Sequence, residues 1–517
     1  MKCYLTKTSG KVFRVSQCQS QEDGKINSYK DNWIDSSQYL YIGGIAGRLE
    51  YSDSSSSVGL ESCTARGDLD IKNNYNNINN YYVGGIVAWV RGESSDDRIN
   101  FNNCLYEQGS ILNKPENPSS VCIGGIAAYA LAARFTNCFS NADSIEADIT
   151  QGNLYLGGFI GRPINLVSIQ DSGNSSPIIM SDSSEPTGYV YVGGFIASFV
   201  VNSGNSHEII QNCWSTGDIY SRGAGNLYTG GLIGYISEPQ TTSSFTLKHC
   251  WTNANVTAIS TGTGNAVNGF CTGGLLGFIS TQNWQILESF ALGDVSAYRS
   301  LGATNSIQIM AGGLVGYVSA DTASDGIQNC YALGNVLADN PNNIGGNIYA
   351  GGLVGNGTYG GDANIRFNFA AGSVTAQTKG TGLVYAGGII GYRGPSLVIS
   401  NNAALGESII AKGSSTLNAG RVYRGSAMTG SINYAYKDML LLTDTYDGTA
   451  TGSTTTSTNA TSTNGHDVTI VELTTPAFWL NPSGLNFNNT LGGIGGITNT
   501  WSFTGIEGRG YPRLAWE

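Results

Sequence analysis

The heptapeptide Tyr349-Ala350-Gly351-Gly352-Leu353-Val354-Gly355 is one copy of a degenerate motif that recurs along this 517-residue chain. Its Gly-Gly pair returns roughly every 40 residues, and roughly eleven copies lie between residues 37 and 435. A tyrosine, cysteine or methionine stands two positions before each intact pair, and an apolar residue stands two positions after it. Such regular spacing indicates one structural unit that is repeated many times.

A second landmark follows the Gly-Gly pair in most repeats, as in Cys213-Trp214-Ser215-Thr216-Gly217-Asp218. Each repeat therefore predicts roughly three short strands, around the Gly-Gly pair, around the cysteine and just before the next pair, separated by polar loops. One repeat cannot bury an apolar face alone, but stacked repeats can. We predict an all-β fold, a parallel and right-handed β-solenoid of about eleven coils and on the order of 50 Å in length.

Stacking turns equivalent sequence positions into ladders along the rod, although the pattern leaves open which face of the Gly-Gly strand points inward. The predicted cysteine ladder contains Cys18, Cys63, Cys104, Cys138, Cys213, Cys250 and Cys330. The predicted tyrosine ladder contains Tyr41, Tyr82, Tyr155, Tyr191, Tyr228, Tyr349 and Tyr385, with Cys122 and Cys271 at the same repeat position.

The cysteines are interpreted as buried free thiols that act as small apolar core residues, because side chains in register point the same way rather than at each other. Disulfide bonds between adjacent coils, from Cys213 to Cys250 or from Cys63 to Cys104, are the alternative. Cys3 belongs to neither ladder. Because the chain has no Cys-x-x-Cys pair, we expect no zinc or iron-sulfur site, and no other cofactor is indicated.

These residues resemble the GLUG-motif repeat family, named for a Gly-Leu-any-Gly core. That core occurs here as Gly231-Leu232-Ile233-Gly234, Gly274-Leu275-Leu276-Gly277, Gly313-Leu314-Val315-Gly316 and Gly352-Leu353-Val354-Gly355. The resemblance covers roughly residues 37 to 435. It implies a repeat region of large secreted or surface-attached proteins, many of them adhesin-like and some accompanied by a metallopeptidase.

Four segments are expected. Residues 1–36 form a first coil or cap, residues 37–435 the solenoid, and residues 436–475 a coil remnant with a flexible loop rich in Thr, Ser and Asn. Residues 476–517 contain Trp479, Trp501 and Trp516, and this aromatic ending is similar to the one that closes GLUG-type arrays. We expect it to cover the unpaired strand edge of the last coil.

Catalytic chemistry has weak support in the sequence. The segment His207-Glu208-Ile209-Ile210-Gln211 begins like a zinc-protease helix but has a glutamine where the second histidine is needed. A carbohydrate-active β-helix enzyme would need clustered carboxylates, yet Asp68, Asp218 and Asp294 share one repeat position typical of turns. The best remaining candidate for a catalytic cluster contains Asp96, Asp97 and Arg98.

The expected partners are other proteins, cell-surface glycans or further copies of the chain. A net charge of −11 gives no reason to expect nucleic acid, and no apolar run is long enough for a membrane span. No secretion signal is visible at the first residues, and candidate glycosylation sites stand at Asn174, Asn255, Asn356, Asn459 and Asn488. The leading hypothesis is a non-enzymatic extracellular structural or adhesive protein; a glycan-active or glycan-binding β-helix and an intracellular scaffold are the alternatives.

Overall fold

The structure is a computed structural model. It describes residues 2–8, 12–19, 26–27, 33–34 and 39–517, the last range with gaps at 51–57, 73–77, 93–97, 166, 202–206, 238–243, 263–268, 305, 320–325, 359–362, 427–431, 450, 455–461 and 488–499.

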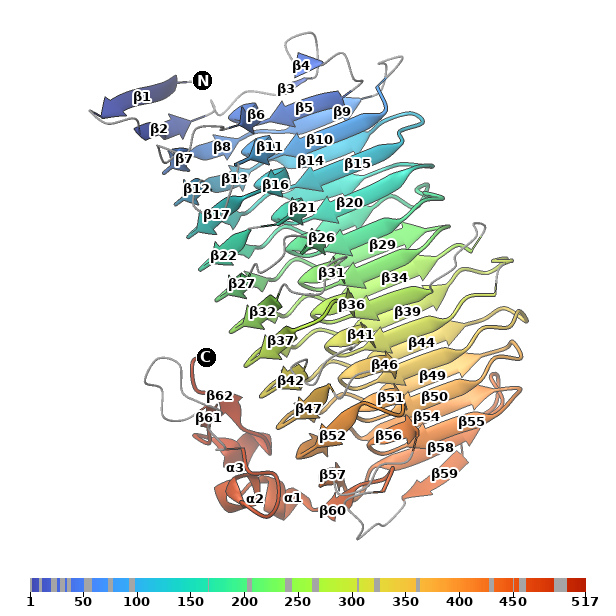
Figure 1. The fold of residues 1–517 in the computed structure, drawn as a ribbon. Helices are drawn as coiled ribbons and strands as arrows, with labels where there is room; N and C mark the ends of the chain where they lie inside the picture. The colour runs from blue at the N-terminus through green and yellow to red at the C-terminus, as the bar shows by residue number, and fades with distance from the viewer. Residues whose placement is uncertain are drawn as a thin grey trace.

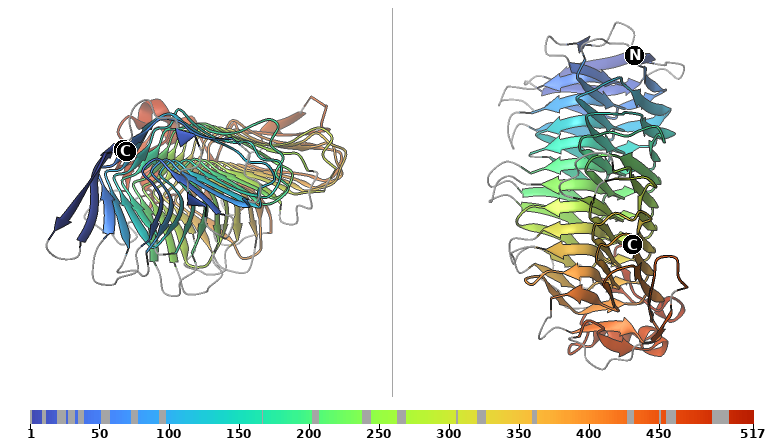
Figure 2. Two further views of the ribbon diagram at one scale, coloured as in Figure 1. Left: turned by 90° about the horizontal axis from the view of Figure 1, so that it is seen from above. Right: turned by 90° about the vertical axis from the view of Figure 1, so that its right-hand side faces the viewer.

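The chain winds into a parallel β-solenoid, which confirms the predicted fold class (Figures 1 and 2). Four sheets run along the rod, named sheet 1 to sheet 4 in the order in which a coil meets them. They contain 12, 11, 24 and 13 strands respectively. Sheet 1 runs from β4 (Trp33–Ile34) and β5 (Tyr39–Gly43) to β55 (Leu417–Gly420), and sheet 2 from β6 (Ala46–Glu50) to β56 (Tyr423–Gly425).

A coil from the middle of the rod shows how the repeat folds. Its strands are β30 (Leu227–Gly230), β31 (Ile233–Ser237), β32 (Ser244–Lys248), β33 (Trp251–Thr252) and β34 (Val256–Ser260). The three predicted strand regions are present, but the Gly-Gly pair divides the first region and the cysteine turn divides the second. A coil therefore contains five short strands, of which β32 and β33 both belong to sheet 3.

The Gly-Gly pair is the bend between sheets 1 and 2. A Cβ atom on Gly230 would lie 1.9 Å from the carbonyl oxygen of Ile233 in the same turn, and one on Gly231 would lie 1.9 Å from that of Gly274 in the next coil. The third glycine of the motif, Gly234, has no room for a side chain, because its added Cβ atom would lie 2.6 Å from the carbonyl oxygen of Val192. Close approach of backbone to backbone therefore explains why glycine recurs at these three positions.

The turn that precedes each residue of the cysteine ladder uses the left-handed backbone conformation. Asparagine adopts this conformation more readily than other side chains do, which explains its frequency just before the cysteines. Positive φ values of 48° to 61° occur at Ser62, Asn103, Asn137, Asp171, Asn212, His249, Glu288, Asn329, Phe367 and Asn401.

Both ends of the rod depart from the regular coil. At the first coil, β1 (Lys2–Thr8) pairs antiparallel with β2 (Val12–Gln19), and β4 pairs antiparallel with β5. At the other end, β59 (Thr451–Thr454) pairs antiparallel with β58 (Leu440–Asp444), so part of the predicted flexible loop is a strand instead.

The aromatic C-terminal segment packs against the side of the rod, so the expected cover over the last strand edge is not confirmed (Figure 1). It contains α2 (Pro476–Leu480), β61 (Trp501–Ser502), α3 (Ile506–Arg509) and β62 (Arg513–Leu514), and α1 (Ile470–Leu473) directly precedes it. Trp501 Nε1 donates to Asn329 Oδ1 at 3.2 Å, and Trp516 Nε1 donates to the carbonyl of Glu288 at 3.1 Å. The outward rings of sheet 3, such as Phe290, Tyr331 and Phe369, supply the apolar surface on which these aromatic residues pack.

The described helices have four or five residues each, too few to cross a membrane.

Candidate functional site

The tyrosine ladder lies on the outer face of sheet 1, apart from the main core. Its members pair in register from coil to coil, as Tyr41 does with Tyr82 and Tyr191 with Tyr228. Stacked ring centroids in this ladder lie 5.0 to 5.5 Å apart. Cys122, Cys271 and Met310 occupy the same column, while the apolar neighbours on the strands, such as Leu227, point into the core. The face left open by the sequence is therefore settled: the tyrosines point outward.

A second column of aromatic residues lies opposite, on the outer face of sheet 2 and five positions after the first glycine of each pair. The two columns meet across the Gly-Gly bend, with the rings of Tyr228 and Tyr235 5.0 Å apart. The outer faces of sheets 1 and 2 therefore meet along an aromatic surface that follows the bend, which we call the aromatic groove. The second column contains Arg48, Trp89, Tyr129, Arg162, Ser198, Tyr235, Phe278, Tyr317, Asn356 and Tyr392.

The tyrosines of the groove are neutral hydrogen-bonding groups. Burial raises the pKa of Tyr191, Tyr228 and Tyr349, and neighbouring tyrosines raise it further. Positive charge enters the groove toward its N-terminal end, where the guanidinium of Arg162 lies 4.7 Å from the ring centre of Tyr155 and that of Arg48 lies 5.5 Å from Tyr41.

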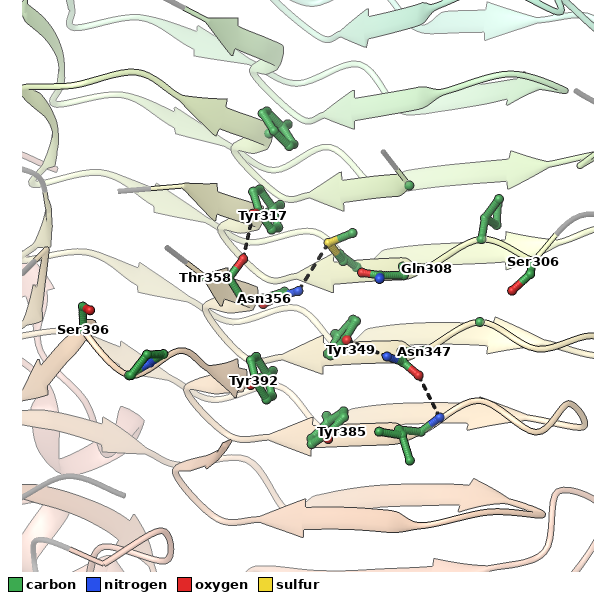
Figure 3. A pocket seen from close by; sticks show the side chains of 17 residues that line it. Ser306, Gln308, Tyr317, Asn347, Tyr349, Asn356, Thr358, Tyr385, Tyr392 and Ser396 are labelled. Atoms are coloured by element: carbon green, nitrogen blue, oxygen red, sulfur yellow. Dashed lines mark hydrogen bonds between the residues drawn. The ribbon is translucent and has the colours of Figure 1, made fainter. Parts of the chain in front are cut away.

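The groove widens into a cleft where both columns are interrupted in adjoining coils (Figure 3). Cys271 and Met310 replace tyrosine in the first column, and Asn356 replaces an aromatic ring in the second, between Tyr317 and Tyr392. The cleft has a volume of about 1070 Å³, and none of the described residues that line it is charged. Its polar side chains are amides and hydroxyls, from Ser306, Gln308, Asn347, Asn356, Thr358 and Ser396, besides the tyrosines.

The cysteine ladder is a column of free buried thiols. No disulfide bond joins any two of the buried cysteines Cys63, Cys104, Cys138, Cys213, Cys250 and Cys330, or Cys122 and Cys271 of the tyrosine column. In the ladder each described thiol lies near carbonyl oxygens of its own or the preceding coil, as Cys330 Sγ does at 3.5 Å from Ile286 O. The side chains of Cys3 and Cys18 lie outside the described residues.

The cysteine column changes composition along the rod, which sequence reasoning missed. Ser172 and Ser289 occupy it between cysteines, and three buried asparagines, Asn368, Asn402 and Asn433, replace the cysteine in the last coils. The signal was available at Ser289, Asn368 and Asn402, because a glycine follows each of them by four positions, as it follows Cys213 and Cys330.

Thiol labelling tests the burial of this column. Burial raises the pKa of Cys122, Cys271 and Cys330, so the reactive thiolate is scarce as well as shielded. We expect at least eight of the ten cysteines to resist an aromatic disulfide reagent in the native protein and all ten to react after unfolding in guanidinium under reducing conditions. Rapid native labelling of three or more cysteines would contradict the placement.

The candidate catalytic carboxylates have structural partners. Asp218 Oδ1 accepts the backbone N–H of Asn255 at 2.9 Å, and Asp294 Oδ1 accepts that of Asn335 at 2.7 Å in a later coil. Asp68 Oδ1 likewise accepts the N–H of Ser110 at 3.0 Å. These residues form a ladder of turn caps that joins successive coils. Of the other proposed cluster the structure describes only Arg98, because Asp96 and Asp97 lie outside the described residues.

The histidine motif forms a strand, β27 (His207–Gln211), rather than a zinc-protease helix. Among the described residues, no group of three or more His, Cys, Asp or Glu side chains could hold a metal ion.

The candidate glycosylation sites differ in exposure. Asn174 is fully buried and donates to the carbonyls of Ser176 and Gly194, and Asn356 is 4% exposed. Buried amides such as these are out of reach of a glycosyl donor in the folded protein, whereas Asn255 is exposed. Asn459 and Asn488 lie outside the described residues.

The sequence predicted the tyrosine ladder on sheet 1 but not the second column on sheet 2. The second column alternates with core residues of β31 and its equivalents, and its fixed offset from the Gly-Gly pair could have identified it.

Comparison of the chain with protein-family models, curated proteins and solved structures gave no match.

Proposed function

We propose that this chain is a non-enzymatic structural or adhesive protein, a stiff rod that holds other molecules along the aromatic groove. The observation that carries the proposal is the pair of in-register columns, whose half-buried aromatic side chains, such as Tyr191, Tyr235 and Tyr392, reach the surface over many coils. Both columns point away from the main core and pack against each other in clusters of their own. Concave aromatic surfaces with a few polar groups are a common form of binding site.

The partners that fit this proposal are cell-surface glycans, other proteins or further copies of the rod. The resemblance to GLUG-motif repeats supports an extracellular or cell-surface location, where such repeats occur in adhesin-like proteins. On this proposal the rod acts by contact, and the carboxylate ladder joins coils rather than cleaving a substrate.

An intracellular scaffold is the second candidate, favoured by the eight free cysteines. Secreted proteins usually carry disulfides instead, because their surroundings are oxidising. The same groove would then hold an intracellular partner.

Adhesion of the purified, fluorescently labelled protein to cells of its source tests the proposal. Tyr191→Glu places a charge in the groove four coils before Asn356, and we expect it to abolish most of the bound fluorescence. The matched control is Tyr220→Glu, on the outer face of sheet 4, where the side chain is also half-buried. Circular dichroism checks that both variants fold. Equal adhesion of the two variants, or no adhesion of the parent protein, would remove the support for an adhesive groove.

A further inference from the structure

The cleft around Asn356 lies where an interruption of the second column adjoins an interruption of the first. Just above it, consecutive rings of the second column cover each other, as Phe278 and Tyr317 do with centroids 4.8 Å apart and planes 14° apart. At Ser198, the earlier interruption of the second column, the first column keeps its tyrosines, Tyr191 and Tyr228. Below Tyr317 the next position in the column is Asn356, whose short side chain leaves the lower face of that ring uncovered (Figure 3). Tyr392 follows in the next coil.

The spacing of these two rings suits one saturated ring. Tyr317 and Tyr392 are two coils apart, which corresponds to about 10 Å between their strands. A pyranose ring between two aromatic faces needs about 8 Å, since carbon atoms in contact lie about 3.5–4.0 Å apart. The gap therefore accepts one sugar ring beyond the end of the Asn356 amide.

The hydrogen-bonding groups around the gap are held in place. Asn347 Nδ2 donates to the hydroxyl of Tyr349 at 3.0 Å, while Asn347 Oδ1 accepts the N–H of Leu383 at 3.0 Å. The hydroxyls of Tyr317 and Thr358 are 2.7 Å apart. Amides and hydroxyls fixed in this way can both donate to and accept from the hydroxyls of a sugar.

Asn356 itself has an unmet hydrogen-bonding requirement. It is 4% exposed, and its Nδ2 reaches only the sulfur of Met310, at 3.7 Å. Its Oδ1 is buried and has no hydrogen-bond partner among the described residues. A buried amide oxygen without a donor is costly, so this position is better explained by a ligand that supplies one.

We propose that the cleft binds a segment of an uncharged polysaccharide, with one sugar ring between Tyr317 and Tyr392 and a sugar hydroxyl donating to Asn356. This inference rests on the proposed adhesive function and names its ligand class. The described lining of the cleft has no charged residue, which selects against acidic glycans, because a carboxylate would lose its hydration without gaining a cation from that lining. A proline-rich peptide also docks in aromatic grooves, but it has few donors and would leave most of these amides and hydroxyls unpaired.

Affinity electrophoresis of the full chain tests the inference. The gels contain hydroxyethylcellulose, galactomannan, arabinoxylan or dextran as neutral probes, and polygalacturonate as the acidic probe. We expect at least one neutral polysaccharide to retard the protein and polygalacturonate to leave its mobility unchanged. A chain that no neutral probe retards, or that polygalacturonate retards as strongly, overturns the inference, as does tighter binding of a polyproline peptide in calorimetry.

Two variants then locate the site on the probe that binds. Asn356→Tyr rebuilds the interrupted column and fills the gap, and other coils already hold aromatic residues in both columns, as Tyr385 and Tyr392 show. Tyr392→Ala removes one ring face instead. We expect each variant to weaken binding about tenfold or more. Tyr220→Ala serves as the control with unchanged affinity. Unchanged affinity of both cleft variants overturns the site.

Cell adhesion and polysaccharide binding are measured separately, so the adhesive function and the ligand class can fail independently. Tyr191→Glu lies outside the cleft, so it should abolish cell adhesion and still bind the soluble probe. A protein that adheres to cells through the groove but binds no neutral polysaccharide refutes the ligand class alone. A protein that binds the polysaccharide through Asn356 but does not adhere refutes the adhesive role alone.

Discussion

Gly313→Ala is expected to destabilise the rod by about 3 kcal/mol or more, the range of severe overpacking in a core. A Cβ atom on Gly313 would lie 2.0 Å from the carbonyl oxygen of Gly352 in the next coil and 2.9 Å from the Cβ of Ala332. The two coils would have to separate, which strains the hydrogen bond from Gly313 N to Gly351 O, 3.1 Å long. The effect should be large because backbone cannot move aside as a side chain can.

Urea unfolding followed by tryptophan fluorescence measures the loss, with Gly508→Ala as the matched control. Gly508 lies in α3, and no atom lies within 4 Å of its added Cβ, so the control should be neutral or slightly stabilising. Hydrogen exchange should show the lost protection first in β40 (Ile309–Gly312) and its neighbours, since a coil contacts only the adjacent coils. A Gly313→Ala midpoint equal to that of the control would contradict the account of the bend.

Asn402→Leu is expected to cost about 3–4 kcal/mol, although leucine has a similar volume and a greater preference for the core. Asn402 Nδ2 donates to Ile365 O at 2.8 Å and to Asn433 Oδ1 at 3.1 Å. Its Oδ1 accepts from Asn368 Nδ2 at 3.0 Å. Leucine would leave several fully buried groups without partners, and each unpaired group costs about 1–3 kcal/mol.

The same denaturation experiment resolves this prediction. Asn402→Ser should lose less stability than the leucine variant, because Ser289 fills the same column with a bond of 2.8 Å to Leu287 O. Asn253→Ala, at an exposed position, should change stability by less than about 0.5 kcal/mol. A leucine variant as stable as the parent would mean that the asparagine column is not needed to join the last coils.

The repeat was readable from the sequence because each of its features has a local cause. Backbone contact at the bend admits only glycine at Gly230 and Gly231, and the left-handed turn favours asparagine at Asn212 and Asn329. These requirements recur in most coils, so they leave a periodic trace. The C-terminal segment illustrates the opposite case. Trp501 and Trp516 occur once, and nothing in their spacing shows that they pack on the side of sheet 3 rather than over its last edge.

The amino-acid sequence alone determined the coil, its stacking and the tyrosine ladder, since period and residue type are properties of one chain segment. The cleft was decided by the tertiary structure. Met310 and Asn356 are both exceptions to their columns, and they make a cavity only because the bend brings sheets 1 and 2 face to face and the stacking places the two exceptions in adjoining coils. Two such exceptions leave no periodic pattern in the sequence. Their proximity is therefore visible only in the folded rod.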